Sequence, residues 1–238
     1  MSKNPTNGER GNILVKIASI ASGGGLYLFL LYVCVWLPTF NLSFYSREYD
    51  KYGVPATIQV SKADLMQVTR HMLGYMMNKK PDLVISTTID GQTREFFNDR
   101  EKSHMADVLG LFNSARIMKN AAIVLFVICL LLSLAKRSAA RFFKTAGLGV
   151  AALGGFTVAV FGIIAINFDR AFTLFHQIFF NNDLWILDPH VDLLVNIVPF
   201  GFFIDISLVV GGLFVASVTL TAVVFLMISG RLKKCSTF

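Results

Sequence analysis

Four long apolar stretches dominate this chain of 238 residues. Only 16% of the residues are charged and 54% are hydrophobic, whereas a soluble domain has about 25% charged residues. A helix needs about 20 predominantly apolar residues to cross the hydrocarbon of a bilayer, and the second stretch reaches that length only with Arg116 and Lys119 at its outer end. The sequence therefore predicts an α-helical membrane protein with four transmembrane helices. The stretches are about Ile13–Leu37, Ala121–Ala135, Thr145–Phe168 and Phe202–Gly230.

The basic residues next to these stretches predict the orientation of the chain. Ten of them, accompanied by the single acid Glu9, fall on one side of a four-span arrangement, and the positive-inside rule makes that side cytoplasmic. Both termini are then cytoplasmic. The net charge of +7 follows from topology, so it does not indicate a nucleic-acid partner. The ten residues are Lys3, Arg10, Lys16, Lys136, Arg137, Arg141, Lys144, Arg231, Lys233 and Lys234.

This orientation divides the chain into five parts. The first stretch is much longer than the core of a signal peptide, which has roughly 7–15 residues, so we expect a retained membrane anchor. The parts are the cytoplasmic N-terminus with the first span (1–37), an extracytoplasmic cap leading into the second span (38–119), the second and third spans with their cytoplasmic loop (120–168), an extracytoplasmic aromatic and acidic segment (169–201), and the fourth span with the cytoplasmic C-terminus (202–238).

The long outer segment has the patterns of a small mixed α/β cap. Apolar residues recur at helical spacing from Lys62 to Met77, and Ser61 before them is a typical N-cap. Asp90-Gly91 lies between two short strand-like runs, 83–89 and 92–97, which is a strong signal for a β-hairpin. A further helix is expected from Asn98 into the second span.

Two histidines on the predicted outer side are candidates for acid–base chemistry. Glu101 and Asp107 lie three residues on either side of His104, so either carboxylate could orient its imidazole on a helix. His176 has Asp169 and Asp183 seven residues away on the same face, provided that its helix continues. The alternative is a hydrogen-bonded structural histidine in each case, and this alternative is the favoured interpretation for the remaining two, His71 and His190.

Other chemistries lack a sequence signal. The chain has no G-x-S-x-G pattern for a nucleophilic serine, and no H-E-x-x-H or Cys-x-x-Cys pattern for a metal site, so no metal is predicted. The outer segments contain no cysteine, which excludes a disulfide framework there.

Two long motifs contain His104 and His176. The first comprises Phe96–Glu101, Ser103–Met105, Asp107–Val108 and Leu111–Phe112, and the second comprises Phe175–Phe180, Asn182–Asp183, Trp185, Asp188–Pro189 and Asp192. Both motifs resemble those of the lipoprotein intramolecular transacylase family of four-span bacterial membrane proteins, and the likeness extends over nearly the whole chain.

The resemblance implies a specific reaction in the bacterial cytoplasmic membrane. The sn-2 acyl chain of a diacylated lipoprotein would move to the α-amino group of its N-terminal cysteine, giving the lyso form, at a site facing the outer leaflet. The implied catalytic residues are His104 and His176, with no cofactor. Arg100, Asn182 and Trp185 are candidates for stabilising the oxyanion, Glu101 and Asp107 for orienting an imidazole, and Asp183 for contacting the substrate. The implied partners are the lipoprotein and membrane lipid.

Two other functions fit the same pattern of residues. The chain could be a non-enzymatic membrane-anchored protein that binds or assembles lipidated partners through its aromatic outer surface. It could also be a metal-dependent membrane hydrolase that uses both histidines. Substitution of His104 distinguishes the first alternative from acyl transfer, and metal removal distinguishes the second.

Overall fold

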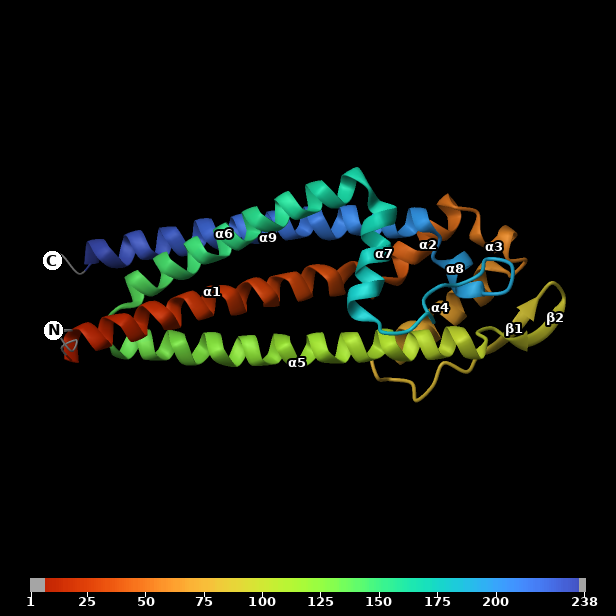
Figure 1. The fold of residues 1–238 in the computed structure, drawn as a ribbon, viewed down its shortest axis with the longest axis horizontal. Helices are drawn as coiled ribbons and strands as arrows, with labels where there is room; N and C mark the ends of the chain where they lie inside the picture. Colours follow the sequence, from red (N-terminus) through yellow and green to blue (C-terminus); the bar gives the residue numbers. More distant parts are fainter. Residues whose placement is uncertain (1–6, 236–238) are drawn as a thin grey trace. The chain divides into compact units, whose positions relative to one another are not determined.

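The computed structural model of the protein describes residues 7–235, and Lys3 of the predicted cytoplasmic charge lies outside them. The chain is mostly helical with one β-hairpin (Figure 1). It divides into two compact units, which we describe separately. The elements are α1 (Asn7–Thr39), α2 (Leu42–Lys51), α3 (Val54–Thr57), α4 (Lys62–Met76), β1 (Ser86–Ile89), β2 (Gln92–Glu95), α5 (Asp99–Ala135), α6 (Ala139–Ile166), α7 (Phe168–Phe179), α8 (Leu193–Ile197) and α9 (Phe200–Cys235).

Within residues 7–235, four helices are long and apolar enough to cross a membrane, which confirms the predicted number of spans. They cover Ile13–Thr39, Asp99–Ala135, Ala139–Ile166 and Phe200–Lys234. The second begins much earlier than the predicted apolar run. A helix of 37 residues is about 55 Å long, whereas the hydrocarbon is about 30 Å thick. Because the charged residues of α5 all lie between Asp99 and Lys119, the first turns of α5 extend beyond the spanning part.

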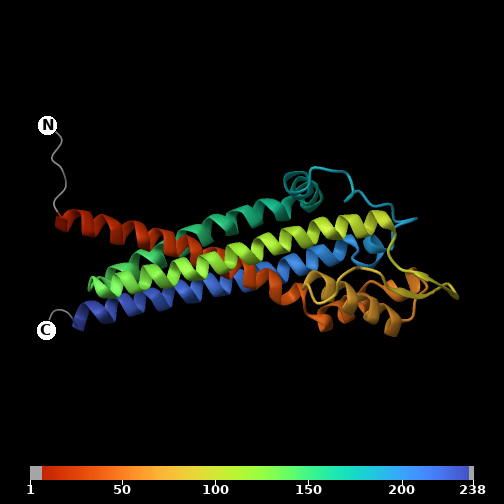
Figure 2. The same ribbon diagram turned by 90° about the horizontal axis from the view of Figure 1, so that it is seen from below.

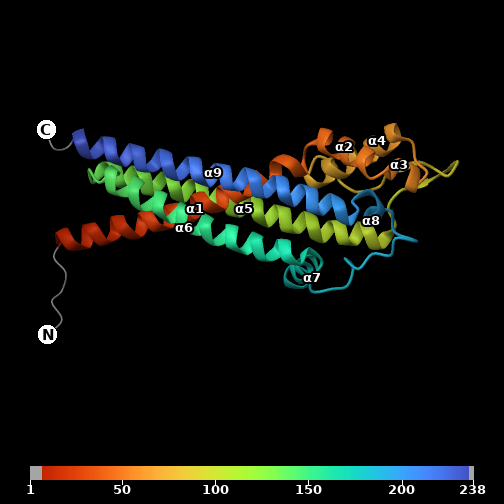
Figure 3. The ribbon, with the colours of Figure 1, turned by 90° about the horizontal axis from the view of Figure 1, so that it is seen from above.

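The bundle unit comprises the described residues up to Val35 together with 115–163 and those from Gly211 onward. In it α1, α5, α6 and α9 run side by side (Figures 2 and 3). Gly154 permits close packing, since a Cβ there would lie 2.3 Å from Val218 Cγ1. Many large apolar side chains of the unit are exposed, as expected of helices that face lipid; examples are Ile17, Ile128, Leu131, Ile163, Leu220 and Met227.

The mixed unit comprises residues 36–114 and 164–210, and it has its own hydrophobic core. The predicted helix after Ser61 is confirmed as α4, and the Ser61 side chain accepts a hydrogen bond from the Asp64 amide at 3.1 Å. The core consists of aromatic and aliphatic side chains from α2, α4, the hairpin, the start of α5 and α8, among them Phe44, Tyr49, Leu65, Val68, Phe96, Phe97 and Ile197.

The predicted hairpin is confirmed, with shorter strands than the sequence suggested. Ile89 pairs with Gln92, so Asp90 and Gly91 form a two-residue turn, and both have positive φ angles, 49° and 73°. Positive φ at both turn positions is the geometry of a type I′ turn. Along β1 the buried side chains are Thr87 and Ile89, so one face of this strand contacts the core. The β structure of the unit is limited to these two strands among the described residues.

Candidate active site

His104 and His176 come together in the mixed unit although they lie on different helices, α5 and α7. Their ring centroids are 6.2 Å apart, with 31° between the ring planes. Both side chains are buried, at 8% and 7% exposure. Phe180, which follows α7, contacts both imidazoles at centroid distances of 5.4 and 5.6 Å. The structure therefore places the two histidines as a pair in an aromatic surrounding.

The tautomer of neutral His176 is set by its contact within α7. His176 Nδ1 lies 2.7 Å from the carbonyl oxygen of Phe172. A carbonyl oxygen only accepts, so Nδ1 carries the proton and Nε2 has the free lone pair. Trp185 stacks on the ring, with centroids 4.8 Å apart and 29° between planes. Burial lowers the pKa of His176, and the hydrogen bond to Phe172 partly opposes that shift. The ring is thus a neutral imidazole able to accept a proton at Nε2.

His104 is held neutral more strongly. Burial, and next the nearby His176, lower the pKa of His104 to about 4, while the Asp107 carboxylate acts in the opposite direction. Its Nδ1 atom is buried and has no hydrogen-bond partner among the described residues. A buried polar atom without a partner costs about 1–3 kcal/mol. A histidine that served only the fold would avoid this cost, so the geometry favours a functional reading of His104.

Glu101, expected to orient His104, makes a different set of contacts. Its side chain is fully buried and accepts hydrogen bonds from the amides of Asn98, at 2.7 Å, and Leu194, at 2.5 Å. The Asn98 side chain in turn accepts from the Glu101 amide at 3.0 Å, which completes a capping box at the start of α5. The carboxylate therefore joins the first turn of α5 to the first turn of α8.

Asn98 and Asp192 extend this contact between α5 and α8. The Asn98 amide group donates to Asp192 Oδ1 at 2.6 Å, and the Asp188 backbone donates to Asp192 Oδ2 at 2.7 Å. We call Asn98, Glu101 and Asp192 the α5–α8 clasp. Sequence reasoning did not assign it, although the Asn98-x-x-Glu101 spacing is itself a capping-box signal.

The segment after α7 is tied to α5 on either side of His104. Arg100 donates through Nη2 to the carbonyl oxygen of Asp183, and Asn182 donates through Nδ2 to Asp107 Oδ2 at 2.9 Å. Arg100 and Asn182, both candidates for stabilising the oxyanion, therefore position the segment that carries Trp185. Asp183 is expected on the helical face of His176 only if that helix continues. Because α7 ends at Phe179, this condition is not met, and Asp183 contacts α5 through its backbone.

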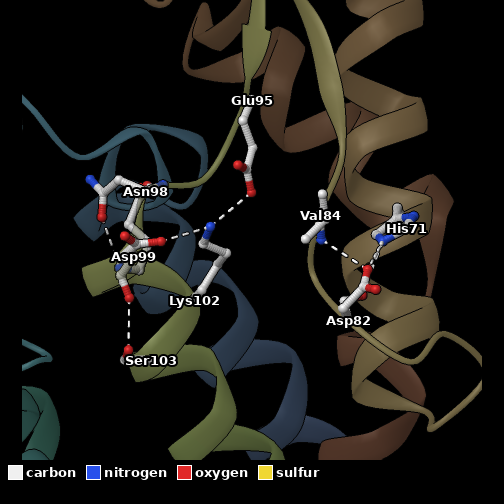
Figure 4. Close-up of polar contacts among 9 residues, drawn as sticks. His71, Asp82, Val84, Glu95, Asn98, Asp99, Lys102 and Ser103 are labelled. Carbon is white, nitrogen blue, oxygen red and sulfur yellow. Dashed lines mark hydrogen bonds and ion pairs between the residues drawn. The ribbon is translucent and has the colours of Figure 1, made fainter.

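The two remaining histidines lie away from the pair. His71 on α4 has Nε2 3.1 Å from the carbonyl oxygen of Asp82, and His190 is exposed. Figure 4 shows His71 beside Asp82, and also Lys102 between the carboxylates of Glu95 and Asp99 at the surface. Within residues 7–235, the His, Cys, Asp and Glu side chains form no group of three or more that could hold a metal ion.

A groove of about 310 Å³ lies beside the histidine pair in the mixed unit. Its polar lining includes Asp107, Ser114 and Asn182, and its aromatic lining includes Phe179 and Phe180. Since Phe180 also contacts both imidazoles, the groove adjoins the pair.

Comparison with known proteins identifies solved structures that are similar to this chain. No curated protein sequence matches the chain. A crystal structure of the membrane integral lipoprotein intramolecular transacylase from Bacillus cereus is similar, with a TM-score of 0.75 and 18% sequence identity, over 95% of this chain and 99% of that one. A variant of that protein with a histidine replaced by arginine gives a TM-score of 0.73 and 18% identity, over 94% and 96% of the two chains.

At this identity the solved structures establish the shared fold. The sequence model of the family itself, described as lipoprotein intramolecular transacylase, matches residues 20–203, which include both histidines and the α5–α8 clasp. The chain therefore belongs to the lipoprotein intramolecular transacylase family of membrane-integral acyltransferases.

Proposed function

We propose that this enzyme moves the sn-2 acyl chain of a diacylglyceryl lipoprotein to the α-amino group of the lipoprotein's N-terminal cysteine. The product is the lyso form, with one N-acyl and one O-acyl chain. The observation that carries the proposal is the buried pair of neutral imidazoles, His104 and His176, 6.2 Å apart. Ester-to-amide exchange needs one group that accepts a proton and one that returns it.

His176 is the proposed base. Its Nδ1 proton is engaged with the Phe172 carbonyl, so Nε2 accepts the proton that the amine loses as its nitrogen attacks the ester carbonyl. An N–C bond forms between the amine and the carbonyl carbon, and the bond between that carbon and the glyceryl oxygen breaks. His104 delivers a proton to the leaving glyceryl oxygen, and transfer of the captured proton from His176 to His104 restores both rings. Starting from the neutral amine, the reaction neither consumes nor releases a net proton, and no covalent acyl-enzyme is needed.

Proximity supplies much of the rate acceleration in this proposal. The amine and the ester belong to one molecule, and a well-oriented intramolecular reaction can gain roughly 7–11 kcal/mol over its bimolecular equivalent. The site then has to hold the amine of the substrate next to its own ester carbonyl and to transfer protons. Phe172 and Phe175, which contact the His176 ring, and Phe203, which packs on Phe172, provide apolar surface for the two acyl chains.

The oxyanion of the tetrahedral intermediate requires a hydrogen-bond donor. Of the three candidates, Arg100 and Asn182 already donate to the segment after α7. Trp185 lies flat against His176, and we assign its indole N–H to the oxyanion.

We further propose that the mixed unit is an extracytoplasmic cap at the outer leaflet and that both chain ends are cytoplasmic. The argument is the distribution of charge: ten basic residues and one acid on the side of the termini, against twelve basic and fourteen acidic residues on the other. Mature lipoproteins carry their lipid in the membrane, so a site at the outer leaflet would meet the substrate and surrounding membrane lipid directly.

The test is a reconstitution. The purified protein in liposomes should convert a synthetic lipopeptide with a free N-terminal amine into the N-acyl, O-monoacyl form, detected by tandem mass spectrometry. Activity should persist after exhaustive chelation. Unchanged substrate in the presence of correctly folded protein, or activity that disappears with metal removal and returns with metal, would contradict the mechanism.

The pH dependence of the rate follows from the neutral imidazoles. Because the pKa of His104 is lowered to about 4, this ring loses its neutral form only as the pH falls toward 4. The substrate α-amino group has a pKa of about 7.7–8.0, so it is the group that titrates in the neutral range. We expect kcat/KM to rise with pH through about 8 in a single step. A second step near 6.5 would indicate ordinary solvent-exposed histidines instead.

A further inference from the structure

The groove beside Asp107 is the one part of the site that acid–base chemistry at the histidine pair leaves unused. It is lined by α5 and by the chain at the end of α7, and polar groups lie there beside Phe179 and Phe180. Asp107, Ser114, Asn181 and Asn182 contribute to it. Such a lining suits a charged or hydrogen-bonding part of the substrate better than an acyl chain.

Asp107 is the charged group of this groove. Its Oδ2 accepts a hydrogen bond from Asn182 Nδ2 at 2.9 Å, which fixes the direction of the carboxylate. A carboxylate can accept about four hydrogen bonds, so Asp107 retains the capacity to bind a further donor. Arg100, a cationic side chain seven residues before Asp107 on α5, is engaged with the carbonyl oxygen of Asp183. Both imidazoles are held neutral by burial, which lowers their pKa values.

The groove is close enough to the histidines to hold the reacting nitrogen. Asp107 follows His104 by three residues on α5, and residues at this spacing have Cβ atoms about 5–6 Å apart. Phe180 lines the groove and also contacts both imidazoles. A primary ammonium group bound to Asp107 therefore lies beside the histidine pair.

The geometry points to Asp107 as the binding site for the α-amino group of the substrate's N-terminal cysteine, with the peptide that follows it lying in the groove. This inference rests on the proposed function, since it takes a lipidated N-terminal cysteine as the substrate. It assigns the two ends of the substrate to different surfaces: the amine and peptide to the Asp107 groove, and the acyl chains to the aromatic rings near His176.

The assignment has a consequence for release of the product. Before the reaction the amine is protonated at neutral pH and is attracted by the Asp107 carboxylate; this ammonium releases one proton to solvent before its neutral nitrogen attacks the ester. After the reaction the same nitrogen is an amide without charge, and this attraction is lost. Asp107 thereby distinguishes substrate from product, and it also disfavours lipoproteins that are already N-acylated.

Equilibrium binding tests the assignment without requiring turnover. The probe is a lipopeptide whose two chains are attached through ether linkages, which cannot be transferred, prepared with either a free or an acetylated N-terminal amine. We expect the full-length protein in detergent to bind the free-amine form about tenfold more tightly at pH 6.5, as befits one charge-assisted hydrogen bond. This preference should shrink at pH 9.0, where the amine is neutral.

Asp107→Asn is the decisive variant, because asparagine retains an oxygen that accepts from Asn182. The Asp107→Asn variant should bind the free-amine probe less than about twofold more tightly than the acetylated probe. Its affinity for the acetylated probe should equal that of the natural sequence, and this equality would show that the groove is intact. Asp99→Asn is the matched control, since it removes the same charge from an exposed position on the same helix. Its preference should be unchanged.

Two results would overturn the inference: no preference for the free amine in the natural sequence, or a full preference retained in Asp107→Asn. The outcome is separable from that of the proposed function. A protein that binds the free amine selectively but never transfers a chain would refute the reaction alone, and one that transfers the chain without amine preference would refute the Asp107 assignment alone.

Discussion

Replacing His176 with glutamine is expected to lower the rate of acyl transfer by about a thousandfold, within the range that general acid–base groups contribute. Glutamine has a similar reach, but its amide cannot take up the proton that the attacking amine loses. The same loss is expected for His104→Gln. Turnover of the synthetic lipopeptide by each purified variant, followed by mass spectrometry, measures the effect.

The two substitutions should not be additive. If the histidines act as one proton relay, the double variant should be about as slow as either single variant, because removing one member already disables the unit. His71→Gln is the control, since His71 contacts the backbone of Asp82 away from the pair. An active His176→Gln enzyme, or a double variant slowed by the product of the single effects, would rule out the relay.

Replacing Glu101 with alanine is expected to destabilise the mixed unit by roughly 3–6 kcal/mol. The substitution leaves two buried amides, those of Asn98 and Leu194, without their charged acceptor, and hydrogen bonds to charged groups contribute about 1.5–3 kcal/mol each. The apparent melting temperature in detergent should fall by at least about 6 °C. Hydrogen exchange at the Leu194 amide should accelerate, because the α5–α8 clasp no longer holds the start of α8.

Two further variants make this prediction specific. Glu101→Gln retains one carbonyl acceptor, so its melting temperature should lie between that of Glu101→Ala and that of the natural sequence. Asp99→Asn changes an exposed acid in the same turn, and its melting temperature should equal that of the natural sequence. If Glu101→Ala melts normally but loses activity, then Glu101 acts on the chemistry and not on the fold.

The features that the sequence predicts well are those with a local physical cause. Membrane crossing depends on the length and polarity of a continuous stretch, so the four spans could be counted from the sequence. The turn at Asp90-Gly91 depends on two adjacent residues that tolerate positive φ, and the Ser61 cap depends on one side chain beside its own helix. Each of these was predicted and is present.

The local patterns failed where an element ended unexpectedly or a side chain had a distant partner. Helical spacing suggested that Asp183 shares a face with His176, but α7 stops at Phe179. Spacing also offered Glu101 as a partner of His104, whereas its carboxylate binds an amide 93 positions later in the chain. A period in the sequence describes a helix and carries no information about what packs against it.

The sequence by itself determined the kind of protein: four membrane-crossing helices, a hairpin and two motifs that contain histidine and resemble those of the transacylase family. Only the tertiary structure brought α5 and α7 together, set the tautomer of His176 through Phe172, buried His104 so that it stays neutral, and placed Asp107 in a groove beside the pair. The reason is that proton affinity and substrate access depend on the surroundings of a side chain in space, and those surroundings come from segments far apart in the chain.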